Sequence, residues 1–76
     1  MKTKKIELYI DGKFAMYSLS ELYKLFGNSE HVTKAYNFAL NMATLDREEF
    51  QQAIEWSRLG KDFDALYELL VEKHSL

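Results

Sequence analysis

The feature that most limits the fold of this chain is a short alternating segment followed by a strong turn signal. Residues 6–10 read Ile-Glu-Leu-Tyr-Ile, so the apolar side chains fall on one face of a β-strand. Asp11 and Gly12 come next, and both residues tolerate the positive φ angles of a tight hairpin turn. A returning strand over 14–17 is therefore predicted, and the rest of the chain has no comparable β segment.

Two registers are open for this hairpin. A two-residue turn places Ile10 opposite Lys13, whereas a three-residue loop pairs Ile10 with Phe14 and Leu8 with Met16. The three-residue loop matches the apolar faces better, so it is the predicted register. Because a lone hairpin is marginally stable in water, helices must cover one side of it.

From Ser18 onward the apolar residues recur with helical spacing, and residues that favour helix ends divide the chain into four segments. Ser18 or Ser20 can cap the first helix and Gly27 can end it, while Asp46 and Asp62 can cap the last two. The second helix is apolar over more than half of its circumference, which indicates the central helix. The predicted helices span about 19–26, 29–44, 46–59 and 62–74.

The predicted fold class is therefore α+β, with an N-terminal β-hairpin over 5–17 packed on a bundle of three to four short helices in the order ββαααα. The chain has 76 residues, which is enough for a single compact domain over 1–76. Its 47 % hydrophobic content supports a dense core. It contains no cysteine and no apolar run of the ~20 residues needed to cross a bilayer, so we expect a cytoplasmic, soluble protein with no membrane partner.

Charge is distributed unevenly along the chain. The net charge is −2, and residues 44–76 carry eight acidic against four basic side chains. A protein that binds nucleic acid by neutralising phosphates normally shows a basic surplus. The N-terminal lysines, at positions 2, 4, 5 and 13, are interpreted as a solvated strand edge that resists aggregation, with an arm that flanks DNA as the alternative.

Side chains able to carry catalysis are scarce. His31 and His74 are the two histidines, and the sequence has neither a metal-binding histidine pair nor a glycine-rich phosphate loop. The acidic pairs at 48–49 and 62–64 stand at helix starts, where capping and the helix dipole account for them. No enzymatic activity, cofactor or metal site is predicted.

Aromatic residues are the more informative class. Trp56 lies off the main apolar stripe of its helix with Leu59 nearby, so the two form either a second buried face or an outer patch. Tyr9 points away from the apolar face of its strand, where together with Tyr17 it forms an aromatic platform or an edge for β-augmentation, unless it is simply a half-buried strand aromatic. The predicted protein-binding residues are Trp56, Leu59, Tyr9 and Tyr17.

The segment Ser18–Tyr36 resembles the helix-turn-helix of many bacterial regulators, with Ser20-Glu21-Leu22 and Gly27 at matching positions. The resemblance covers about a quarter of the chain. It implies that the major groove of DNA would be faced by Ser29, Thr33, Lys34 and Asn37. Two positions depart from the pattern: Tyr23 stands where the family usually has Ala, and Thr33 where it has Val or Ile. The alternative is that the segment is only a capped helix–Gly–helix corner, because packing alone can produce the same sequence pattern.

The leading functional hypothesis is a small non-catalytic regulatory or inhibitory protein that binds another protein, and that resembles in type the accessory proteins of bacterial phages and mobile elements. A homodimer through the same apolar patch is compatible with this reading. The alternative is a DNA-binding regulator that uses the helix over 29–44.

Overall fold

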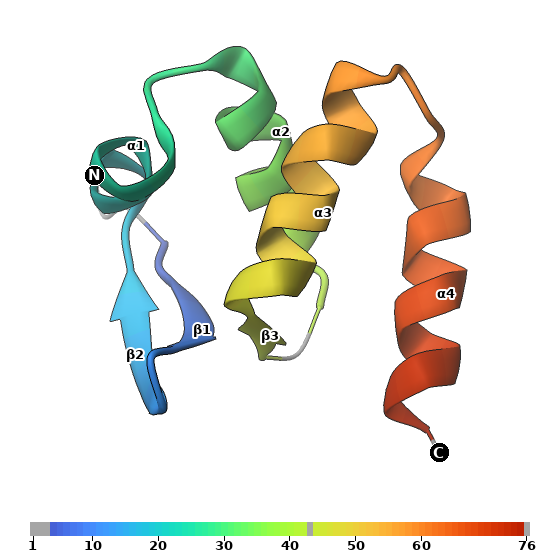
Figure 1. The fold of residues 1–76 in the computed structure, drawn as a ribbon, viewed down its shortest axis with the longest axis horizontal. Helices are drawn as coiled ribbons and strands as arrows, with labels where there is room; N and C mark the ends of the chain where they lie inside the picture. The colour runs from blue at the N-terminus through green and yellow to red at the C-terminus, as the bar shows by residue number, and fades with distance from the viewer. Residues whose placement is uncertain (1–3, 43, 76) are drawn as a thin grey trace.

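The computed structural model describes residues 4–42 and 44–75, and its elements confirm the α+β class (Figure 1). A β-hairpin is followed by two helices, a two-residue strand and two longer helices. In chain order the elements are β1 (Ile6–Ile10), β2 (Lys13–Tyr17), α1 (Leu19–Phe26), α2 (Glu30–Ala39), β3 (Leu45–Asp46), α3 (Arg47–Arg58) and α4 (Phe63–His74).

The sheet contains a third strand that the sequence did not predict. Its strand order is β2-β1-β3, and β3 runs parallel to β1 with Leu45 beside Leu8 and Asp46 beside Tyr9. The predicted helix over 29–44 is correspondingly too long, because α2 ends at Ala39. Residues 40–42 form a turn, and the chain then extends to reach β1; Ala43 lies outside the described residues.

The predicted register of the hairpin is wrong. Asp11 and Gly12 have φ angles of 53° and 80°, so they form a two-residue turn with both central residues at positive φ. Ile10 consequently pairs with Lys13, and the apolar match that favoured the longer loop is not made. The turn prevails because its twist suits the strands and because only one face of the hairpin has to be apolar.

The core lies between the inner face of the sheet and the helices. Alternate residues of β1 are buried, and α2 is buried on several sides, which confirms it as the central helix. The largest fully buried side chains are Phe50, Leu8, Leu22, Leu45, Leu66 and Val32. The side chains of Ser18, Asp46 and Asp62 cap α1, α3 and α4, as predicted.

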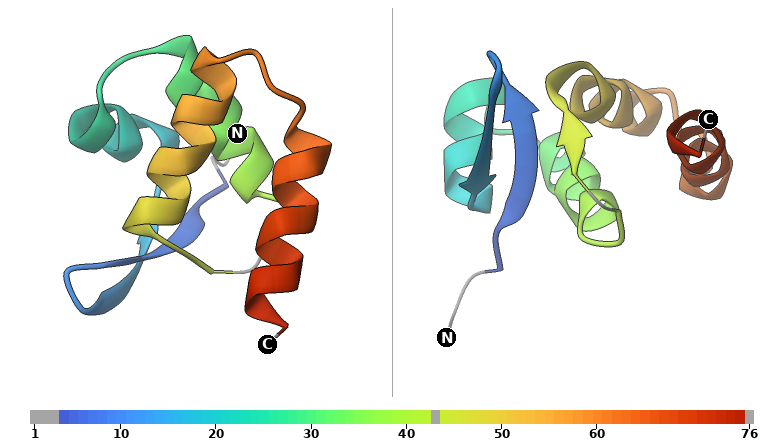
Figure 2. Two further views of the ribbon diagram at one scale, coloured as in Figure 1. Left: turned by 45° about the vertical axis from the view of Figure 1, so that its right-hand side comes forward. Right: turned by 90° about the horizontal axis from the view of Figure 1, so that it is seen from below.

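The hairpin and α4 lie on opposite sides of the molecule, with α2 and α3 between them (Figures 1 and 2). β2 is an edge strand of the sheet, and α4 packs mainly on α3. Within the described ranges, no helix is long and apolar enough to cross a membrane.

Candidate functional site

The outer face of the hairpin carries an exposed apolar patch that the described helices leave uncovered. Tyr9 and Phe14 form a cross-strand pair with ring centroids 4.7 Å apart. Their side chains are 40 % and 65 % exposed, and Met16, on the same face, is 51 % exposed. These three residues are called the outer sheet face below. Solvent-exposed aromatic and methionine side chains in one group are typical of a protein-binding surface.

Strand alternation produces this face. The inward residues of β1 are buried among the helices, so the neighbouring Tyr9 must point outward. Because the turn has two residues, Phe14 is directly opposite Tyr9 and Met16 is opposite Glu7. Side chains at such paired positions stand close enough to stabilise one another.

Carboxylates surround the aromatic pair. Glu7 lies opposite Met16, next to the outer sheet face, and accepts a hydrogen bond from the hydroxyl of Thr44. A surface hollow of about 310 Å³ beside the pair is lined by Tyr9, Asp11, Asp46, Arg47 and Glu48. The three carboxylates of this hollow outnumber its one cation, Arg47, so its surroundings favour cations over phosphates.

Tyr17 lies on the other face of the hairpin from Tyr9. It pairs with Ile6 and is half-buried against the core. The predicted platform of Tyr9 and Tyr17 is therefore wrong, and Phe14 takes the place beside Tyr9. The register decides this, because a shift by one residue moves every side chain of a strand to the opposite face.

Trp56 is half-buried against the core, and its indole is held from two sides. The indole Nε1–H donates to the carbonyl oxygen of Asp62 at 2.7 Å, and the Lys61 ammonium lies 4.6 Å from the ring centroid. Leu59, one turn further along, is 66 % exposed. Trp56 thus fixes the loop between α3 and α4, and Leu59 stands alone at the end of α3.

The predicted protein-binding residues therefore do not form one surface. Tyr9 pairs with Asp46 at the start of α3, whereas Trp56 and Leu59 lie near the end of that helix. The rise of an α-helix separates these two places by about 15 Å along the axis.

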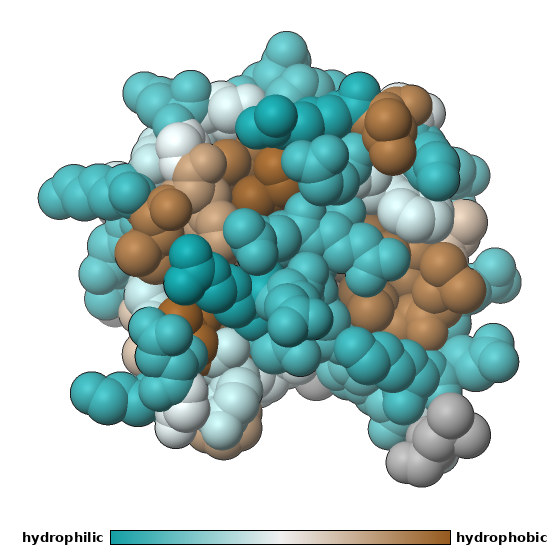
Figure 3. Space-filling view, viewed as in Figure 1, coloured by the Kyte–Doolittle hydropathy of each residue, from teal (hydrophilic) through white to brown (hydrophobic). Residues whose placement is uncertain are grey.

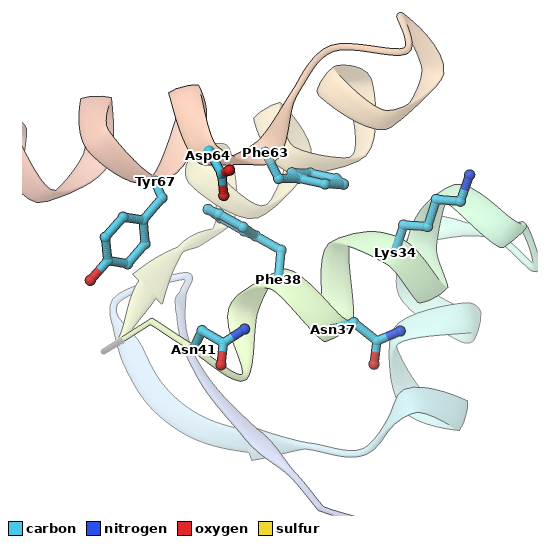
Figure 4. Close-up of a pocket in the computed structure, with 7 residues that line it drawn as sticks. All are labelled: Lys34, Asn37, Phe38, Asn41, Phe63, Asp64 and Tyr67. Atoms are coloured by element: carbon cyan, nitrogen blue, oxygen red, sulfur yellow. The ribbon is translucent and has the colours of Figure 1, made fainter.

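A groove of about 600 Å³ separates α2 from α4 (Figure 4). Phe38 and Phe63 stack across its floor with centroids 5.1 Å apart. Tyr67 and Asn41 lie toward one end and Lys34 toward the other, with Asp64 on the α4 side. On the face seen in Figure 3, apolar surface gathers between α1 and α3 and along α4, divided by polar side chains.

The residues implied by the helix-turn-helix resemblance are partly engaged within the chain. The Ser29 side chain caps α2 by accepting from the backbone N–H of His31, and the Thr33 hydroxyl hydrogen-bonds the hydroxyl of Tyr23. Lys34 and Asn37 are exposed and line the groove beside α4. The two departures from the family pattern, Tyr23 and Thr33, therefore contact each other directly.

The sequence did not reveal the buried carboxylate of Glu49. Burial alone would raise its pKa, but hydrogen bonds from the His74 imidazole, the Asp46 backbone N–H and the Lys73 ammonium outweigh burial and lower the pKa. The capping box of Asp46 and Glu49 was detectable, since the residues are three apart. The contacts from α4 were not, because Lys73 and His74 are distant from Glu49 in the sequence.

His31 is also used to join helices. Its Nδ1 lies 2.9 Å from the hydroxyl oxygen of Ser57, which is buried in α3. The contact links the first turn of α2 to the last turn of α3.

No protein-family model matches the chain, and comparisons with the curated proteins and with the solved structures return no match.

Proposed function

We propose that this chain is a small non-catalytic regulatory or inhibitory protein that acts by binding another protein through the outer sheet face. The observation that carries the proposal is the exposed pair of Tyr9 and Phe14, whose rings are in contact at a tilted angle of 50°. Tyrosine and other large side chains at the centre of an interface contribute much of the binding energy, because they bury a large area with few rotatable bonds.

Charge supports a protein partner over DNA. Glu7 lies on the same side of the sheet as the aromatic pair, and the hollow beside Tyr9 is lined by three carboxylates against the one cation of Arg47, a balance that disfavours phosphates. The groove along α2 is lined by both Lys34 and Asp64, so the positive charge of Lys34 is offset by a nearby carboxylate. A partner that presents arginine or lysine beside an apolar centre fits the outer sheet face, since these cations also stack on aromatic rings.

Photo-crosslinking from the outer sheet face tests the proposal. A photoreactive phenylalanine analogue replaces Phe14, and a second version of the protein carries it at Leu59. The two positions are almost equally exposed, at 65 % and 66 %, so they differ in place and not in accessibility. After irradiation in a lysate of the source cells, we expect one protein to be captured from position 14 and not from position 59.

Binding of the captured protein is then measured with purified components. We expect Tyr9→Ser and Phe14→Ser each to weaken the complex by about 30-fold, the effect of a 2 kcal/mol hot spot. Leu59→Ser serves as the matched control and should leave the affinity unchanged. Loss of binding with Trp56→Ala or Leu59→Ser, but not with Phe14→Ser, would contradict the proposed surface. Capture of DNA that depends on Lys34 and Asn37 would favour the DNA-binding alternative.

A further inference from the structure

The outer edge of the sheet is formed by β2, which pairs on one side with β1 and has no described strand on its other side. Figures 1 and 2 place β2 at the margin of the molecule, away from α3 and α4. Proteins usually protect such an edge with proline, a bulge or charged side chains. The sequence of β2 is Lys-Phe-Ala-Met-Tyr, and its one charge is at the end of the strand.

Two residues of β2 direct their backbone groups outward. In a hairpin with a two-residue turn, the closing pair Ile10–Lys13 is hydrogen-bonded, and hydrogen-bonded and non-hydrogen-bonded pairs then alternate. Lys13, Ala15 and Tyr17 accordingly direct their N–H and C=O groups toward β1. Phe14 and Met16 direct theirs away from the sheet.

We propose that a second copy of this chain pairs with this edge, β2 against β2 and antiparallel, with the two-fold axis at Ala15. In this register Phe14 lies opposite Met16 of the second copy, and each pair exchanges two backbone hydrogen bonds. All the outward backbone groups of β2 are then paired, and the two sheets of three strands become one sheet of six.

The side chains of β2 are self-complementary in this register. Phe14 and Met16 are both apolar and both exposed on the outer sheet face, so each covers the other across the interface. Ala15, at the axis, is small enough for the two copies to approach closely. Lys13 lies opposite Tyr17 of the second copy, so no like charges meet and the ammonium can stack on the ring.

Other registers leave part of the edge unpaired. Moving the axis to Phe14 places its ring against its own copy and sets Met16 opposite Gly12, which has no side chain to pack. Moving the axis to Met16 sets Phe14 opposite Ser18, the cap of α1. The register centred on Ala15 alone matches every residue of the five-residue strand.

This dimer forms without the partner protein. It also extends the surface that is proposed to bind that partner. Across the axis the two outer sheet faces join, so that Tyr9, Phe14 and the second copy's Met16 form a continuous row. A contact of two five-residue strands is small, so we expect a dissociation constant in the micromolar range. Because the dimer forms from the purified chain alone, its failure is distinguishable from failure of the proposed function.

Sedimentation of the purified chain tests the dimer. Over concentrations from about 10 μM to about 1 mM, we expect the mass to rise from the 9.0 kDa of one chain to twice that value. A mass of 9.0 kDa at every concentration would overturn the proposal.

Two double variants test the register. Phe14→Lys with Met16→Lys places like charges opposite each other across the axis, whereas Phe14→Lys with Met16→Glu places opposite charges there. Both variants remove the same apolar side chains. We expect the first to be monomeric and the second to associate at least about tenfold more tightly, since a like-charge contact replaces an attraction. Equal association of the two variants would exclude this register.

The same comparison controls for folding. Within one chain Met16 is opposite Glu7, so Met16→Glu introduces a repulsion and Met16→Lys introduces an attraction. The variant expected to dimerise is therefore the less stable one, so a loss of folded dimer through unfolding would oppose the expected order. Circular dichroism at the concentrations used for sedimentation verifies that both variants are folded.

Disulfide formation by a cysteine introduced at the axis is a second test of the register. The native chain contains no cysteine, so no other disulfide can form. Ala15→Cys places two sulfurs at the two-fold axis, where directly opposed strand residues are close enough for a disulfide. In a glutathione buffer we expect this variant to form covalent dimers much faster than Gln51→Cys, an exposed control on α3. Equal rates for the two variants would contradict pairing at Ala15.

Discussion

The imidazole Nε2 of His74 hydrogen-bonds the carboxylate of Glu49 at 2.6 Å and so ties the last turn of α4 to the first turn of α3. The Lys73 ammonium reaches the same carboxylate at 3.2 Å, and the backbone N–H of Asp46 donates to it at 2.9 Å. Glu49 is 4 % exposed, so three donors satisfy a carboxylate that water does not reach. This contact adds polar interactions to the packing of α4 on α3.

Removing this charge should destabilise the fold. Glu49→Gln keeps the shape of the side chain but loses the attraction to Lys73 and His74. We expect the free energy of unfolding to fall by about 2 kcal/mol, as for other buried hydrogen bonds to charged groups. Urea denaturation measures the change. Glu48→Gln, an exposed neighbour in the same helical turn, is the control and should change it little. Equal effects of the two substitutions would mean that the buried contacts are unimportant.

Stability should also depend on pH through this group. The pKa of Glu49 is lowered from 4.5, so in the pH range near 4.5 the unfolded chain binds more protons at this position than the folded chain. Stability from the carboxylate is present above the unfolded pKa and is lost as the pH falls through the folded pKa. Below about pH 4.5 the native chain should lose stability more steeply than Glu49→Gln. If the free energy of unfolding of the two proteins changed equally with pH between about pH 6 and about pH 2.5, this expectation would be contradicted.

The sequence was most informative where the signal is local. Helix caps and breakers such as Ser18, Asp46 and Asp62 act within three residues, so the bounds of α1, α3 and α4 were predicted to within one residue. β3 was missed because a two-residue strand has no periodicity of its own and forms only where Leu8 is available to pair. The predicted register is wrong because matching of the apolar faces favours a three-residue loop, whereas the geometry of the Asp11-Gly12 turn decides the pairing.

The candidate site was partly predictable for the same reason. Strand alternation identified Tyr9 as outward-facing, but its true neighbour Phe14 depends on the register. Trp56 was recognised as lying off the apolar stripe, but nothing in the sequence shows that its indole N–H bonds the Asp62 carbonyl. Contacts between residues distant in sequence require the tertiary structure.

The hydroxyl contact between Tyr23 and Thr33 should stabilise the α1–α2 corner. Tyr23→Phe and Thr33→Val each remove one partner, and we expect each to lower stability by about 1 kcal/mol. Because both substitutions break the same bond, the double variant should cost less than the sum of the single variants. A double-mutant cycle in urea measures this coupling, and strict additivity would show that the bond contributes nothing.

Trp56 should report on the loop between α3 and α4. Trp56→Phe keeps much of the apolar packing but removes the hydrogen bond to Asp62, so we expect a loss of about 1 kcal/mol. Leu59→Ala is the control, because that exposed side chain should contribute little. As the chain has one tryptophan, its fluorescence also measures accessibility. We expect acrylamide to quench the folded chain less than the urea-unfolded chain; equal quenching would contradict the half-buried position.

The two-residue turn can be tested through its glycine. Gly12 has a φ of 80°, which residues with a Cβ rarely adopt, and a Cβ built there would meet no atom within 4 Å. Gly12→Ala should therefore cost about 1 kcal/mol through backbone conformation alone. Asp11→Asn is the matched change, since Asn-Gly favours the same turn, and it should leave stability equal or higher. If Gly12→Ala were as stable as the native chain, Gly12 would not occupy the positive-φ position, and the register that sets Phe14 beside Tyr9 would lose its support.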